Sequence, residues 1–117
     1  MTPRIASLAH EEMWLLALDG KNRVRSLRRV AQGGLHSTAV APRDILRLAL
    51  GDAASAMIVV HNHPSGDADP SPEDIAMTER LEGAGETVGV PLVDHLVIVS
   101  GGRYTSMLDL GVLGGAT

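Results

Sequence analysis

Residues 56–74 read AMIVVHNHPSGDADPSPED, and this stretch combines the patterns of a strand, a loop and a helix start. Residues 56–60 form a continuous apolar run, which is typical of a buried strand. Residues 65–70 are rich in Gly, Asp and Pro, a composition that indicates a loop. Residues 71–74 then have the pattern of a helix start: a Ser cap, a Pro at the first helical position and acids in the first turn. The stretch therefore predicts a strand and a loop, followed by a helix that begins near the end of the strand.

The flanking sequence predicts further elements around this centre. Residues 19–22 (DGKN) have turn chemistry between two strand-like runs, so a hairpin is expected there. Pro42 suits the first turn of a helix that Gly51 ends, and the later helix should run from Pro72 to about Gly83 or Gly85. The other expected elements are strands, at residues 13–18, 23–31, 56–60, 92–99 and 103–107. This order predicts an α/β or α+β fold on a mixed sheet, and it leaves the order of strands in the sheet open.

Length and composition set the outer limits. The chain has 117 residues, so one domain spanning 1–117 is expected, and 44% apolar residues can supply its core. That core must be aliphatic, because there is no Phe and only one Trp and one Tyr. No apolar run reaches bilayer length and no signal-peptide pattern is present, so a cytoplasmic protein without a membrane segment is the default expectation.

Charge and cysteine content restrict the chemistry. With no cysteine, any metal site must use nitrogen and oxygen ligands. The net charge of −4 argues against a dedicated nucleic-acid binder. A local basic cluster lies between positions 21 and 29, and we interpret it first as a solvated hairpin face. The alternative interpretation is a phosphate-contacting surface made by Arg23, Arg25, Arg28 and Arg29.

Three residues of the central stretch can converge on a metal ion. His61 and His63 are two apart at a strand end, so both side chains point to the same face. Asp74 lies in the first turn of the following helix, which can bring its carboxylate opposite the histidines. Two His and one carboxylate leave the fourth zinc position open, which is the pattern of catalytic sites. Each part has an ordinary explanation as well, since His-x-His pairs are common and Ser71-x-x-Asp74 resembles a capping box.

The same residues carry a resemblance to a known family. Residues 61–66 (HNHPSG) and 70–74 (PSPED) resemble the JAMM signature, which is H-x-H-P followed by S-x-x-D. More narrowly they are similar to the RadC branch of the JAB/MPN proteins, and the similarity covers about residues 10–108. Further segments similar to that branch are LDGKNRV at 18–24, APRDIL at 41–46 and LVDHLVIVSGGRYTSM at 92–107.

The resemblance implies a fold and a set of roles. The implied fold is the JAB/MPN, cytidine-deaminase-like architecture, in which a mixed sheet is packed between helices. His61, His63 and Asp74 would bind Zn²⁺, and Ser71 would donate a hydrogen bond to the oxyanion. A glutamate near the first strand would be the general base. Aligning the Leu-Asp of residues 18–19 with the family places Glu11 there, and strand alternation allows at most one of Glu11 and Glu12 to reach the metal.

Other positions have weaker assignments. His95 is interpreted as a hydrogen-bonded histidine in a strand, and the resemblance adds a supporting role beside the metal for it and Asp94. Asp67 and Asp69 are alternative oxygen ligands, although acids in such a loop usually form turns. The chain also departs from the family pattern. A helix-hairpin-helix domain is not expected, because nine lead-in residues cannot form one, and the loop at residues 40–44 lacks the expected His and Glu.

Three functions follow, in order of preference. The first is a zinc metallopeptidase or isopeptidase acting on a protein or peptide, such as the tail of a ubiquitin-like protein. The second is a metal-dependent DNA nuclease or a DNA-repair protein of the RadC type, for which the basic cluster is the supporting feature. The third is a non-catalytic MPN scaffold, which would have no need of a complete ligand set. A homodimer is compatible with the hairpin edge, and the sequence does not decide it.

Overall fold

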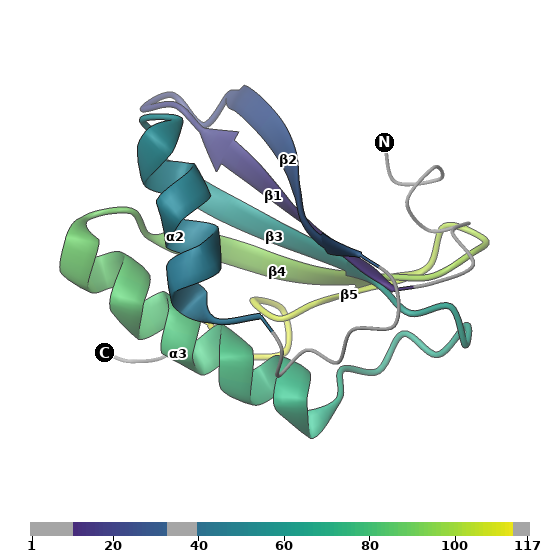
Figure 1. Cartoon of the computed structure of the whole chain (residues 1–117). Coiled ribbons are helices and arrows are strands. Elements are labelled where there is room, and N and C mark those ends of the chain that lie inside the picture. The colour runs from purple at the N-terminus through teal and green to yellow at the C-terminus, as the bar shows by residue number, and fades with distance from the viewer. Residues whose placement is uncertain (1–10, 33–39, 114–117) are drawn as a thin grey trace.

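A computed structural model describes residues 11–32 and 40–113 of the chain. Its elements are β1 Glu12–Leu18, β2 Val24–Gln32, α2 Pro42–Gly51, β3 Ala56–Asn62, α3 Pro72–Val88, β4 Leu92–Ile98 and β5 Tyr104–Ser106 (Figure 1). The predicted order of strands and helices is confirmed, and each predicted strand agrees with the observed one to within two residues. Within the described residues, no helix is both long and apolar enough to span a bilayer.

The strands form one mixed sheet in the order β2-β1-β3-β4-β5. Strands β3 and β4 are parallel, and the other three pairs are antiparallel. The β1–β2 pair is the expected hairpin, whose turn is held by the Asp19 carboxylate accepting from the Lys21 and Arg23 amides. The parallel β3–β4 pair requires a crossover, which α3 supplies. The mixed α/β class expected from the sequence is therefore confirmed.

Strand alternation divides the apolar side chains between the two faces of the sheet. Helices α2 and α3 both cover one face, and the main aliphatic core lies between them and the sheet (Figure 1). Its central members are Leu15, Ile45, Met57, Val59, Met77, Leu81 and Val97. The other face carries a smaller cluster, Leu16, Val60 and Ile98, with Trp14, Ile58 and Leu96 against it. The five-stranded mixed sheet with its helices is consistent with the JAB/MPN fold that the resemblance implies, and both helices among the described residues lie on the same face.

Helix α3 ends later than predicted. It continues to Val88 and is capped by Gly89, whose φ of 81° is in the left-handed region that glycine favours. The prediction that Gly83 or Gly85 ends the helix is therefore wrong. Gly85 is glycine for a different reason: a Cβ at this position would lie 2.5 Å from the Val90 carbonyl oxygen, where the chain turns back into β4.

This close approach predicts a large difference between two glycines of the same helix. Gly85→Ala should lower the free energy of unfolding by about 1–3 kcal/mol, because the new methyl group meets backbone that cannot easily move. Gly83→Ala is the matched control, since nothing lies within 4 Å of its Cβ position. Alanine should be neutral there or stabilise by up to about 1 kcal/mol. Urea unfolding of both variants measures the difference, and equal stabilities would contradict the packing argument.

Candidate metal centre

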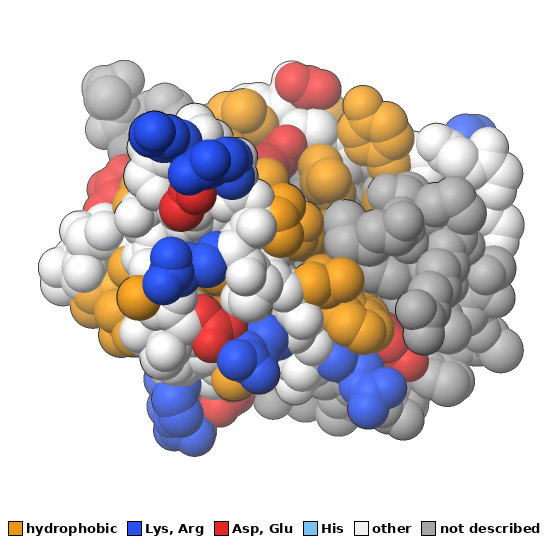
Figure 2. All heavy atoms as spheres, turned by 90° about the horizontal axis from the view of Figure 1, so that it is seen from above, with side chains coloured by type: hydrophobic (Ala, Val, Ile, Leu, Met, Phe, Trp, Pro, Cys, Tyr) orange, Lys and Arg blue, Asp and Glu red, His pale blue; other side chains and the backbone are white. Residues whose placement is uncertain are grey.

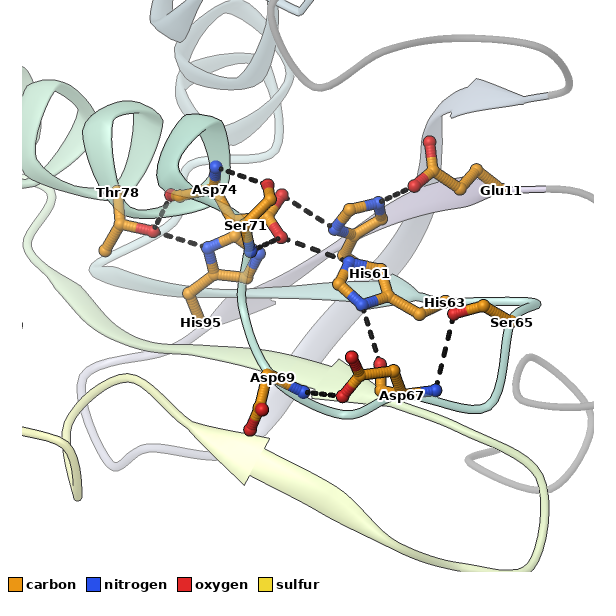
Figure 3. Close-up of polar contacts among 10 residues, drawn as sticks. All are labelled: Glu11, His61, His63, Ser65, Asp67, Asp69, Ser71, Asp74, Thr78 and His95. Carbon is orange, nitrogen blue, oxygen red and sulfur yellow. Dashed lines mark hydrogen bonds and ion pairs between the residues drawn. The ribbon is translucent and has the colours of Figure 1, made fainter.

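The candidate site lies where β3 ends and α3 begins (Figure 3). His61 is the second-last residue of β3. Its side chain points to the helix-covered face of the sheet, like those of Met57 and Val59 before it. His63 follows two residues later, and the two imidazole rings lie with centroids 4.8 Å apart at 87°. His61 is buried, whereas His63 is partly exposed. The predicted convergence of the two histidines is therefore present.

Asp74 lies in the first turn of α3, and its carboxylate faces the two histidines. Its Oδ1 is 3.3 Å from His61 Nδ1, and its Oδ2 is 3.1 Å from His63 Nε2. The Ser71 amide also donates to Oδ2, and the Asp74 amide donates to Ser71 Oγ, which completes a capping box. The capping role of Asp74 does not compete with its predicted role as a ligand, because the same carboxylate caps the helix and faces the histidines.

The charge state of Asp74 follows from these contacts. Burial alone would raise the pKa of Asp74, but His61, His63 and the Ser71 amide outweigh burial and hold this pKa well below its usual range. The side chain is therefore an anion at neutral pH, as a metal ligand must be.

Glu11, and not Glu12, lies beside the histidines. Glu11 has the same strand parity as Met13, which pairs with His61, and its Oε1 is 3.3 Å from His61 Nε2. Glu12 points to the opposite face, where its carboxylate accepts from Trp14 Nε1 at 2.9 Å. The alternation argument of the sequence therefore separates the two glutamates as expected.

The donor atoms fit a metal ion. Glu11, His61 and His63 each offer one ligand atom, and these atoms lie within 4.8 Å of one another, so the group could hold a metal. Among the described residues, His61 Nδ1 and Asp74 Oδ1 are buried without a hydrogen-bond partner, although they are 3.3 Å apart. Two ligands of a tetrahedral zinc ion are also about 3.3 Å apart, given bonds of about 2.0–2.1 Å. His61 faces Glu11 with Nε2 and Asp74 with Nδ1. Two ligand sets can therefore be drawn: both histidines with Glu11, or both histidines with Asp74.

The loop after β3 orients His63. His63 Nδ1 lies 2.9 Å from the Asp67 carbonyl oxygen, which leaves Nε2 directed at Asp74 (Figure 3). A backbone carbonyl on the second ring nitrogen is the usual support for a metal-binding histidine. Hydrogen bonding to Asp74 raises the pKa of His63, in agreement with both nitrogens acting as donors when the ring is charged. The Asp67 side chain accepts from the Asp69 amide, which is the turn-forming role expected of loop acids.

His95 and Asp94 are placed very differently. His95 is fully buried on the helix-covered face, with its ring centroid 6.1 Å from that of His61. Burial lowers the pKa of His95 to about 4, so the ring is neutral at pH 7. The Asp94 side chain instead accepts from Ser106 Oγ and the Leu108 amide, which ties β4 to the end of β5 and to the chain after it. The structure thus brings His95 near the candidate ligands and does not bring Asp94 there.

One residue of the site was missed by the sequence reasoning. Thr78 Oγ1 donates to the Asp74 carbonyl at 2.7 Å and lies 2.6 Å from His95 Nδ1. The available signal was its position four residues after Asp74, one helical turn further along α3.

The four arginines suggested as phosphate contacts already have partners on β1, in the β1–β2 turn and in the chain after α2. Arg28 makes two hydrogen bonds of 2.7 Å to the Asp52 carboxylate, and Arg25 Nε donates to the Asp52 carbonyl. Arg23 pairs with Asp19 at 3.0 Å, and Arg29 lies 3.9 Å from Glu12. Blue and red side chains are accordingly interspersed on the face shown in Figure 2. These contacts favour the interpretation as a solvated hairpin face, while contact with phosphate stays an untested prediction.

The Asp52 contacts predict a pH dependence of stability. Hydrogen bonds from Arg28 and Ser26 lower the pKa of Asp52 to about 2. A carboxyl whose pKa is lower in the folded state stabilises the fold above its ordinary pKa, and this contribution is lost as pH falls through about 2. Asp52→Asn should therefore lower the midpoint of thermal unfolding at pH 7 and flatten its fall between about pH 4 and 2. Unfolding scans across this range test the expectation, and parallel pH curves for the two proteins would refute it.

Comparison with known proteins agrees with this geometry. A family model described as the RadC-like JAB domain matches residues 1–112. The chain belongs to this family. The RadC resemblance seen in the sequence is therefore confirmed, and with it the relation to the wider JAMM/MPN proteins.

Curated relatives carry the name UPF0758 protein. The one from Desulforudis audaxviator is 46% identical over 97 residues, which cover 83% of this chain and 42% of the relative. The one from Symbiobacterium thermophilum is 42% identical over 115 residues, covering 98% of this chain and 49% of the relative. The RadC-like chain thus spans about half the length of the relatives it matches.

Proposed function

We propose that this RadC-like JAB domain is a zinc-dependent hydrolase that cleaves an amide or isopeptide bond in a protein or peptide. The observation that supports this most directly is the meeting of His61, His63 and Asp74 at hydrogen-bonding distances, with Glu11 beside them. Two buried atoms that lack a hydrogen-bond partner among the described residues, His61 Nδ1 and Asp74 Oδ1, are readily explained by a cation that both would bind.

The donor set favours zinc. Two imidazoles and a carboxylate suit this borderline ion, whereas Mg²⁺ and Ca²⁺ prefer oxygen ligands. Three protein ligands also leave one position for a reacting molecule, unlike the closed four-ligand sites that only support structure. His61, His63 and Asp74 are the proposed ligands, because Glu11 is the most exposed of the four carboxylate and imidazole groups and is better placed to meet solvent and substrate.

The remaining residues have roles that follow from their contacts. Bound zinc would supply a Lewis acid that polarises a carbonyl group and lowers the pKa of water to about 7. Glu11 is proposed to take the proton of the attacking water and to return it to the leaving nitrogen. Ser71 Oγ already accepts from the Asp74 amide, so its own hydrogen can be donated to an oxyanion.

We prefer an amide substrate over a phosphodiester, because most of the arginines that could bind phosphate are paired with acidic groups of the same chain. A nuclease of this kind would need cations free to contact the phosphate backbone. Arg23, Arg28 and Arg29 instead lie against acidic side chains of the same chain. A ubiquitin-like tail is one candidate substrate, and loops around the site would decide between this and other peptides.

The ligand assignment predicts the metal content of three variants. The wild-type protein should contain about one zinc per chain, and His63→Ala should lose nearly all of it. Asp74→Asn should also lose zinc if Asp74 is a ligand. Asp69→Ala is the matched control, because Asp69 lies in the same loop with an exposed side chain. Metal analysis after dialysis measures all four proteins, and full zinc content in His63→Ala would exclude the proposed site.

The base assignment predicts a difference between two adjacent glutamates. Glu11→Gln should keep zinc and reduce peptide cleavage by about 10²–10⁴-fold, because the general base is lost. Glu12→Gln should keep both zinc and activity, since Glu12 faces the other side of the sheet. The assay uses a fluorogenic peptide panel, with labelled DNA in parallel and a chelator as control. Loss of zinc in Glu11→Gln would make Glu11 a ligand, and cleavage of DNA alone would replace the peptidase proposal.

A further inference from the structure

Three buried side-chain atoms lack a hydrogen-bond partner among the described residues: His61 Nδ1, Asp74 Oδ1 and His95 Nε2. The first two belong to proposed ligands, but the proposed mechanism makes no use of His95. Burying an imidazole nitrogen without a hydrogen-bond partner lowers the stability of the folded state, so the position of His95 needs an explanation.

The proton of His95 can be assigned from the hydrogen bond between its ring and Thr78. Thr78 has a single hydroxyl hydrogen, which it donates to the Asp74 carbonyl oxygen at 2.7 Å. Thr78 Oγ1 must therefore accept from His95 Nδ1, which lies 2.6 Å away. His95 then carries its proton on Nδ1, and Nε2 has a bare lone pair.

Strand β4 places the His95 side chain on the same face of the sheet as the candidate metal centre. In the parallel β3–β4 pair, His95 is opposite Val59 and therefore points to the same face as His61. Its ring is tilted by 35° from the His61 ring at a centroid distance of 6.1 Å. In Figure 3 the His95 ring lies beneath the start of α3, with Nδ1 toward Thr78.

We infer that His95, acting with Thr78, is a positioning residue of the metal centre. The inference rests on the proposed function. The chain of two hydrogen bonds joins β4 to the Asp74 backbone, which sets the place of the Asp74 carboxylate relative to β3. The neutral His95 ring, whose centroid is 6.1 Å from that of His61, also adds no positive charge that would oppose a bound cation.

The test compares zinc affinity across variants that break the chain at different points. Thr78→Val keeps the shape of the side chain but removes the hydroxyl, so zinc should bind about 10–100-fold more weakly. Thr78→Ser restores a hydroxyl and should bind nearly as tightly as the wild type. His95→Asn keeps a donor near the Nδ1 position but lacks Nε2, so its affinity should fall less than that of Thr78→Val. Competition with a chromophoric chelator gives the dissociation constants, and unfolding midpoints confirm that each variant is folded.

A second measurement uses the wild-type protein without metal. Nitrogen chemical shifts of His95 should show the Nδ1–H tautomer, and an Nε2–H tautomer would overturn the inference even if Thr78→Val fails to fold. Unchanged zinc affinity in folded Thr78→Val would also overturn it, while the proposed function would stand. If the wild type itself binds no zinc, the proposed function fails and the metal-centre role of His95 fails with it.

Discussion

The Asp74 carboxylate caps helix α3 and faces both histidines, and these two roles together determine the geometry of the site. One oxygen accepts from the Ser71 amide and lies near His63, and the other faces His61. The start of α3 therefore cannot shift without moving the carboxylate away from the histidines. A helix cap is normally a local stabilising device, but here it also fixes the distance between a helix and the end of a central strand.

Much of the fold could be predicted from local pattern. Apolar runs, turn residues and the Ser71–Pro72 start were sufficient for the order of elements, because each acts within a few residues. The end of α3 was predicted wrongly, because several glycines follow one another there and only Gly89 takes the left-handed conformation that ends the helix. The order of strands could not be predicted for a different reason, because pairing of β1 with β3 joins segments that are distant in the chain.

The site was partly predictable, and the limits have a physical cause. Spacing of two along a strand was enough to bring His61 and His63 together, and alternation separated Glu11 from Glu12. Thr78 carried no comparable signal, because a threonine within a helix commonly bonds back to the preceding turn. Only its contact with His95 on another element gives it a further role, and such contacts are set by the assembled sheet and helix.

The pairing of β1 with β3 has a consequence for the cost of building the site. Glu11 and His61 are brought together by a ladder that runs from Met13–His61 to Leu18–Ala56, so the entropy of closing this long loop is offset by strand pairing and core burial. An ion entering the site would meet donors already gathered by the fold, and its binding energy would not be consumed in ordering the chain.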